Sequence, residues 1–206
     1  MDAIVAPLAY TGSVTLWGHM AQAKTIYLEQ HDNYQKQTQR NRMYIHGANG
    51  RLMLSIPVMH LGKPGFQKYN NVEIDNRFPW QSQHWKSLQS AYRSSPYFEF
   101  YEDQLYFLYH NSFTNLYSFN TAYFNVLREL LRCLNKVILT KSFEINPKQP
   151  DLRELQNHKK KSKIAGLRYT QVFTEKNGFI PDLSVLDLLF NYGPESIGLL
   201  KKCTFN

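Results

Sequence analysis

The chain has 206 residues, and its 24 Lys+Arg against 16 Asp+Glu give a formal net charge of +8. Hydrophobic residues make up 43% and aromatic residues 15% of the chain, enough for a packed core, which excludes a largely disordered protein. The length fits a single domain over residues 1–206. Two cysteines, Cys133 and Cys203, exclude a disulfide scaffold and show no zinc-binding spacing, so we expect reduced thiols.

The beginning of the chain gives no sign of export. No cationic stretch precedes the first apolar residues, so we expect no secretory signal. No apolar run approaches the ~20 residues that span a bilayer. These features predict a cytoplasmic protein without a transmembrane segment.

The first 33 residues have the pattern of a βαβ unit. Residues 3–10 predict a buried strand, Ser13 can cap a helix over 14–22, and residues 25–29 predict a second strand. Ligands of such units bind at the carboxyl ends of the strands. Here those ends are residues 10–12 and 30–33.

A hairpin is predicted next. Asn49-Gly50 lies between two apolar runs, 43–46 and 52–58, which is a strong hairpin signal. We expect a further short strand over 71–74. The connection over 59–70 is expected to be mobile.

The middle of the chain predicts three helices. One spans 81–92, and Ser95 with Pro96 predicts the start of a second over 96–110. The third, over 115–134, has the clearest amphipathic pattern in the chain.

The last third predicts strands over 137–143 and 169–174, followed by a short helical pair. Ser184 and Asp187 have capping-box spacing and predict a helix through Asn191 that stops at Gly193, with Pro194 starting the next. Together, the elements predict an α/β fold, with a mixed α+β arrangement left open. The expected order is the βαβ unit, the hairpin, a helical middle and a short C-terminal helical pair.

Most of the net charge is concentrated in residues 148–168. This segment has seven of the basic residues and two of the acidic ones, so it carries +5 of the total +8. Pro150 within the segment, Pro147 just before it and the polar composition favour an exposed basic loop or linker within the domain, with a short helical piece as an option. The alternative is a landing site for phosphate, nucleic acid or anionic headgroups.

The densest polar run follows the second predicted strand. Lys36, Arg40 and Arg42 could hold a phosphate or carboxylate there, while an exposed polar loop is an equal alternative. If 40–46 is a strand, Asn41 faces the core and needs a partner.

Two further residues are candidates. His84, before Trp85, is the candidate general base, with a structural role as its alternative. Asn120 lies in the apolar stripe of the third helix, where an amide must be hydrogen-bonded, either to lock a loop or to line a pocket. The histidine spacings give no helical metal pair, and no P-loop, G-x-G-x-x-G or G-x-S-x-G motif is present.

Several of these stretches together resemble the WbqC-like family of bacterial and archaeal proteins. They are 32–36 with 40–42, 48–50 with 54–58, His84-Trp85, 92–98, Phe119-Asn120 and, most specifically, 183–194. The likeness runs from about Tyr10 to Pro194. Compared with longer members of the family, this chain is short between about 148 and 169. At the opening of the family pattern, Tyr10 is the residue that matches.

The resemblance implies an enzyme of O-antigen-type cell-surface polysaccharide synthesis that modifies a nucleotide- or lipid-linked sugar, with acyl or aminoacyl transfer to an amino-sugar as one reaction. Its implied base is His84, and the cofactor stays unknown. The implied substrate-binding residues are Tyr10, Asp32, Lys36, Arg40, Asn41, Arg42 and Asn120.

Two other functions remain open. A binding or scaffold protein could use the basic segment, although nucleic acid is disfavoured because 158–163 is short. A nucleotide-binding transferase of the nucleotidyltransferase type lacks its expected G-h-G-H or H-x-G-H turn, because Trp17-Gly18-His19-Met20 falls in the first predicted helix.

Overall fold

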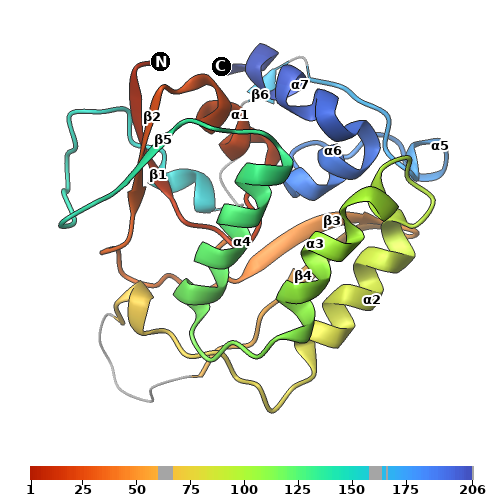
Figure 1. Ribbon diagram of the computed structural model, residues 1–206, viewed down its shortest axis with the longest axis horizontal. Coiled ribbons are helices and arrows are strands. Elements are labelled where there is room, and N and C mark those ends of the chain that lie inside the picture. The colour runs from red at the N-terminus through yellow and green to blue at the C-terminus, as the bar shows by residue number, and fades with distance from the viewer. Residues whose placement is uncertain (60–66, 158–163, 166, 206) are drawn as a thin grey trace.

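The computed structural model describes residues 1–59, 67–157, 164–165 and 167–205. It has the predicted mixed α/β architecture (Figure 1). The predicted basic run 158–163 and most of the predicted mobile loop lie outside these residues. No helix in the described ranges combines the length and apolar character needed to cross a membrane.

A parallel sheet forms one half of the molecule. Its strands are β1 (Ala3–Pro7), β2 (Thr25–Glu29) and β5 (Lys136–Leu139), in the order β1-β2-β5. Helix α1 (Val14–Gln22) connects β1 to β2, and the Oγ of Ser13 accepts the Leu16 N–H at 3.4 Å as its N-cap. The predicted βαβ unit is therefore confirmed.

Residues 150–152 pair with the outer edge of β1 and extend the sheet by one short segment. Val5 N–H donates to Pro150 O at 2.9 Å, and Leu152 N–H donates to Val5 O at 2.8 Å. The pairing of Val5 with Asp151 is parallel. The chain thus leaves β5 at one edge and returns at the other, followed by the short helix η2 (Arg153–Gln156), and residues 140–149 form the connecting loop in teal in Figure 1.

The predicted hairpin is confirmed as β3 (Arg42–Gly47) and β4 (Gly50–Ser55), with Met43 opposite Leu54. It packs against α2 and α6. The predicted strand over 71–74 is wrong: after η1 (Tyr69–Asn71), Ile74 and Glu73 form single bridges with Val58 and Asn115.

The three predicted middle helices are present as α2 (Trp80–Tyr92), α3 (Phe98–His110) and α4 (Leu116–Leu130). The predicted cap at Ser95 is wrong, because its Oγ donates to Tyr92 O at 2.6 Å and closes α2 instead. Helix α4 is shorter than predicted. Arg132 has a φ of 54°, which ends the helical path, and Leu134 is 81% exposed.

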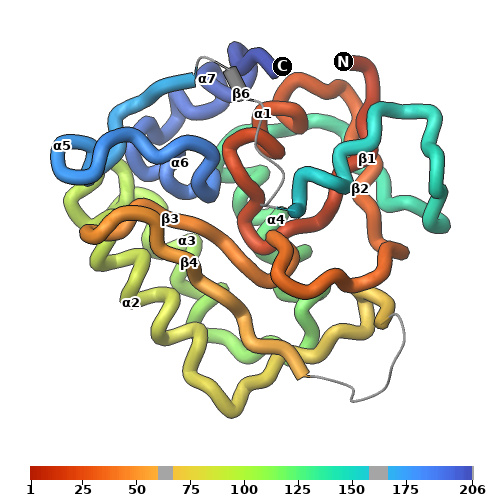
Figure 2. The backbone as a smooth tube through the Cα atoms, turned by 180° about the vertical axis from the view of Figure 1, so that it is seen from behind, coloured from red at the N-terminus to blue at the C-terminus, as the bar shows by residue number. Residues whose placement is uncertain are grey.

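The C-terminal part comprises α5 (Thr174–Asn177), α6 (Val185–Tyr192), η3 (Gly193–Glu195) and α7 (Ser196–Lys202), with α7 packed on α1 (Figure 2). The short strands β6 (Ile164–Ala165) and β7 (Thr204–Phe205) pair antiparallel. The predicted strand over 169–174 is wrong. The side chains of Tyr169 and Gln171, two positions apart, are both buried and donate hydrogen bonds to Asp187. The segment therefore has the alternating burial that is typical of a strand without forming one.

Gly193, directly after α6, lies against Tyr97 at the start of α3. Its φ is 51°, and a Cβ at this position would lie 2.4 Å from the Tyr97 ring. The Tyr97 N–H donates to Phe190 O at 3.0 Å, which fixes this approach. Both the left-handed backbone and the close ring therefore require glycine.

We expect Gly193→Ala to lower the free energy of unfolding by about 2–4 kcal/mol, from backbone strain and overpacking. Urea denaturation measures this. Gly198→Ala is the control: no atom of the described residues lies within 4 Å of its added Cβ in α7, so helix propensity should leave the protein as stable or up to ~1 kcal/mol more stable. Equal effects of the two substitutions would contradict the account of Gly193.

Candidate functional site

A cavity of about 410 Å³ lies against one face of the parallel sheet. Val5, Tyr27 and Ile138 line it from neighbouring strands, and side chains of the 140–149 loop line it from the other side. The alternate strand residues, such as Ile4 and Ile26, are fully buried in the core. Its charged lining residues are Glu29, Lys141, Glu144, Lys148 and Arg153.

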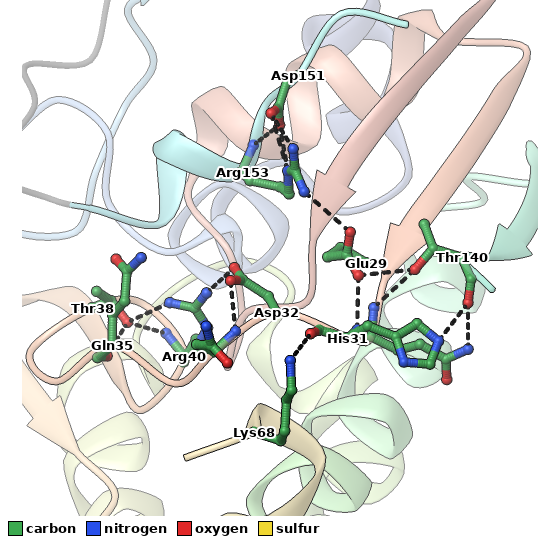
Figure 3. Close-up of polar contacts among 12 residues, drawn as sticks. Glu29, His31, Asp32, Gln35, Thr38, Arg40, Lys68, Thr140, Asp151 and Arg153 are labelled. Atoms are coloured by element: carbon green, nitrogen blue, oxygen red, sulfur yellow. Dashed lines mark hydrogen bonds and ion pairs between the residues drawn. The ribbon is translucent and has the colours of Figure 1, made fainter. Parts of the chain in front are cut away.

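Glu29 is the last residue of β2 and is 3% exposed. One carboxylate oxygen accepts the His31 N–H at 2.7 Å and the Thr140 hydroxyl at 2.9 Å. The other lies 3.3 Å from Nη1 of Arg153 (Figure 3). The carboxylate is thus held by groups that follow β2, follow β5 and belong to the returning segment.

Arg153 is 6% exposed and joins the returning segment to the sheet. Its Nη2 donates to Asp151 at 2.6 Å and to the Glu144 carbonyl at 2.7 Å. Its guanidinium also lies 4.3 Å from the centre of the Phe143 ring. The hydrogen bonds to Asp151 hold the pKa of Arg153 above its usual value, so it is a permanent buried cation.

A second cavity, of about 270 Å³, also has Arg153 in its lining. The loop segment 142–145 contributes alternately to the two cavities: Ser142 and Glu144 to the first, Phe143 and Ile145 to the second. The second cavity is further lined by Asp32, Gln35, Asp151, Glu154, Gln156 and Asn157.

Asp32 connects the second cavity to other predicted site residues. It forms an ion pair with Arg40, which is 1% exposed and also lies 5.4 Å from the Tyr69 ring centre. Burial lowers the pKa of Arg40, and Asp32 opposes this. Asn120 donates to the Arg40 carbonyl at 2.7 Å and to the Tyr69 hydroxyl. Asp32, Arg40 and Asn120 therefore form one connected group.

Tyr10 and His84 form a second group inside the core. The Tyr10 hydroxyl lies 2.9 Å from His84 Nδ1 and 2.9 Å from the Tyr109 hydroxyl, which reaches Tyr123 at 3.0 Å. Burial lowers the pKa of His84 to about 4, so its ring is neutral at pH 7. His84 is 4% exposed and lines neither of the two cavities.

The other predicted residues lie apart from these groups. Lys36 is exposed, and Asn41 donates to Ile56 O at 3.0 Å beyond the end of the hairpin. Arg42 lies near Tyr34: burial raises the pKa of that phenol to about 12, while Arg40 and Arg42 oppose the rise. The binding and catalytic roles of all eight candidates stay predictions.

The buried carboxylate of Asp187 links two stretches singled out in the sequence, 92–98 and 183–194. Asp187 is fully buried and accepts hydrogen bonds from the Tyr92 and Tyr169 hydroxyls, both at 2.8 Å, and from Gln171 at 2.9 Å. Its predicted capping role is therefore wrong, although Ser184 does cap α6 through its Oγ. Burial raises the pKa of Asp187 to about 6 despite the three donors.

A comparison with models of known protein families shows to which family the chain belongs. Residues 13–166 match the model of the WbqC-like protein family. The chain belongs to this family. The matched range contains both groups of predicted residues except Tyr10, and it contains both members of the Glu29–Arg153 pair. No curated protein and no solved structure matches this WbqC-like chain.

The sequence did not reveal Glu29, Thr140, Asp151 and Arg153 as site residues of this WbqC-like protein. Within 148–168, expected as an exposed basic loop, Arg153 is instead buried. A carboxylate at the last position of an apolar strand and the Asp-x-Arg spacing at 151–153 were the available signals. Neither signal identifies its partner, because Glu29 and Arg153 are 124 residues apart.

Arg153→Met should lower the free energy of unfolding by about 3–5 kcal/mol, because it leaves the Glu29 carboxylate buried without its cation. Urea denaturation of Arg153→Met, of Glu29→Gln and of the double variant Glu29→Gln/Arg153→Met measures this. The double variant should regain part of the loss, whereas the exposed Lys176→Met should change stability by less than about 0.5 kcal/mol. A double variant that loses the sum of both effects would show that the two groups are not coupled.

Asp187 should make stability depend on pH. Its pKa is about 6 in the folded chain and ~3.9 unfolded, so its stabilising contribution is complete below pH ~4 and is lost as pH rises through 6. Relative to Asp187→Asn, the wild type should lose about 2 kcal/mol between pH 4 and 7. Urea denaturation across this range measures the difference, and the exposed Asp103→Asn should follow the wild-type curve. A constant difference between wild type and Asp187→Asn would contradict the raised pKa.

Proposed function

We propose that the chain is an enzyme that modifies a sugar precursor of O-antigen-type cell-surface polysaccharide, by transferring an acyl or aminoacyl group to an amino-sugar. The observation that carries this is the first cavity, which combines a buried carboxylate, hydroxyls, an apolar floor and lysines at the carboxyl end of a parallel sheet. The setting in polysaccharide synthesis comes from what membership of the family implies.

The lining of the first cavity suits a sugar ring. Glu29, Glu144 and the hydroxyls of Thr140 and Ser142 offer acceptors and donors to sugar hydroxyl and amino groups. Tyr27, with neighbouring aliphatic side chains, offers an apolar surface for the C–H face of the ring. Few convergent polar groups over an apolar floor are the usual composition of a small-molecule site.

The phosphate of a nucleotide- or lipid-linked sugar needs cations. Lys141 and Lys148 are exposed residues of the cavity lining, and lysine binds phosphate as a point charge. Arg153, in contrast, is already bonded to Asp151 and Glu29. The lysines are therefore proposed to hold the phosphate while Arg153 holds the site together.

In the proposed reaction, the sugar amine attacks the acyl carbonyl carbon. A C–N bond forms, the bond to the leaving group breaks, and the amine proton passes to a base. We assign this base to Glu29, which lines the cavity, rather than to His84, which does not. The positive charge of Arg153, 3.3 Å from the Glu29 carboxylate, favours the negative charge that develops on the carbonyl oxygen.

UDP-glucosamine is the probe for this proposal. Calorimetry should show binding that the double variant Lys141→Ala/Lys148→Ala weakens about tenfold, with a reduced salt dependence. The matched control, Lys201→Ala/Lys202→Ala, removes two exposed lysines of α7 and should bind as the wild type does. Absence of binding, or equal loss in both double variants, would contradict the site.

Turnover tests the assignment of the base. With UDP-glucosamine and a panel of acyl-thioester and aminoacyl donors, mass spectrometry should detect the N-acylated sugar. Glu29→Gln should reduce its formation by about 10²–10⁴-fold, whereas His84→Gln should retain it. The reverse result would return the role to His84.

A further inference from the structure

The hydroxyl of Thr140 contacts the carboxylate that we assign as the base of the first cavity. Its Oγ1 donates to Glu29 Oε1 at 2.9 Å, and both residues line that cavity (Figure 3). A hydroxyl within hydrogen-bond reach of a carboxylate is the arrangement in which a base takes the proton of an attacking nucleophile. The pair therefore has the geometry required for covalent catalysis.

Hydrogen bonds hold Thr140, the first residue after β5, in one position. Its N–H donates to Leu28 O at 3.1 Å, and its carbonyl accepts from Gln30 Nε2 at 2.6 Å and lies 3.1 Å from His31 Nε2. The Gln30 N–H also donates to Oγ1 at 3.3 Å. Because this donor takes one lone pair of the hydroxyl oxygen, the proton is left for Glu29 and the second lone pair for an electrophile in the cavity.

Glu29 is oriented in turn by further groups. Its Oε1 also accepts the His31 N–H at 2.7 Å, and its Oε2 lies 3.3 Å from Arg153 Nη1. A nucleophile, its base and a third group that orients the base are the usual components of an activated nucleophile. A carboxylate suffices as the base, because the proton moves only as the bond between Oγ1 and carbon forms.

We propose that Thr140 is the nucleophile of the transfer and carries the acyl group as an ester before the sugar receives it. This inference rests on the proposed function, because it divides the same reaction into two steps. In the first, Oγ1 attacks the carbonyl carbon of a thioester or aminoacyl ester donor. The bond between Oγ1 and carbon forms, the bond to the leaving group breaks, and the hydroxyl proton passes through Glu29 to the leaving group.

In the second step, the sugar amine attacks the carbonyl carbon of the Thr140 ester. A C–N bond forms, the bond between carbon and Oγ1 breaks, and the amine proton passes through Glu29 back to Oγ1. Both residues then have the protonation state with which the cycle began.

The size of the first cavity favours two steps over one. Its volume of about 410 Å³ lies near the lower end of the range for a site of one small molecule, roughly 300–1,000 Å³. Direct transfer would require the acyl donor and the nucleotide- or lipid-linked sugar in this space together. An ester on Thr140 allows the donor to leave before the sugar binds.

p-Nitrophenyl acetate, an activated ester, is the probe, mixed with the full chain in the absence of sugar. Peptide mass spectrometry should find one acetyl group on Thr140, formed with a burst of p-nitrophenol. Thr140→Val should lose the burst, Thr140→Ser should keep it, and Glu29→Gln should slow it by about 10²–10⁴-fold. The control Thr174→Val removes a hydroxyl that accepts the Gln171 N–H at 3.1 Å at the start of α5, and it should react as the wild type does.

The inference is overturned if the wild type gains no acetyl group on Thr140, or if Thr140→Val releases p-nitrophenol in the same burst. Equal rates for Glu29→Gln and Thr174→Val would also overturn it. Circular dichroism confirms that each variant is folded before the reaction.

Turnover with UDP-glucosamine separates this inference from the proposed function. An acetyl group on Thr140 without any N-acylated sugar retains the nucleophile and removes the amino-sugar acceptor. N-acylated sugar formed by Thr140→Val at the wild-type rate retains the proposed function and removes the ester.

Discussion

The buried ion pair between Glu29 and Arg153 is the interaction on which both cavities depend. It ties the returning segment at the edge of β1 to the carboxyl end of β2, so that the loop 140–149 stays over the sheet. Burying two charges is costly, and the cost is offset only when further hydrogen bonds satisfy both groups. Asp151, Thr140 and the Glu144 carbonyl supply those bonds, so the pair forms only when β2, β5 and the returning segment are all in place.

The core of this protein contains two hydrogen-bonded networks of tyrosine hydroxyls. The hydroxyls of Tyr10, Tyr109 and Tyr123 bond to one another, and those of Tyr92 and Tyr169 bond to Asp187. A hydroxyl that finds no partner in an apolar core costs free energy, so each of these networks is satisfied in one arrangement of α2, α3, α4 and α6. The high tyrosine content thus favours a unique packing of the helices, and Asp187 of α6 takes part in it.

Three local signals predict the structure correctly, whereas the roles of Glu29, Arg153 and Asp187 depend on partners far away in the sequence. The cap at Ser13, the Asn49-Gly50 turn and the stop at Gly193 each involve residues within a few positions of one another, and all three are present. Asp187 was misjudged because its partner Tyr92 is 95 residues away, and its spacing from Ser184 fitted a capping box. Of the candidate site, Asp32 was predicted as a site residue, whereas Arg153 was hidden in a segment whose composition indicated exposure.

The net charge and the site act over different distances. Beyond about 8 Å, exposed charges are largely screened at physiological salt, so the overall +8 favours the approach of anions in general but does not select among them. Discrimination between ligands depends on the linings: the first cavity has two lysines and Arg153 beside two glutamates, whereas the second has Arg153 and no lysine among the described residues. The loop segment 142–145 contributes side chains to both cavities in alternation, so its position over the sheet determines the lining of each cavity.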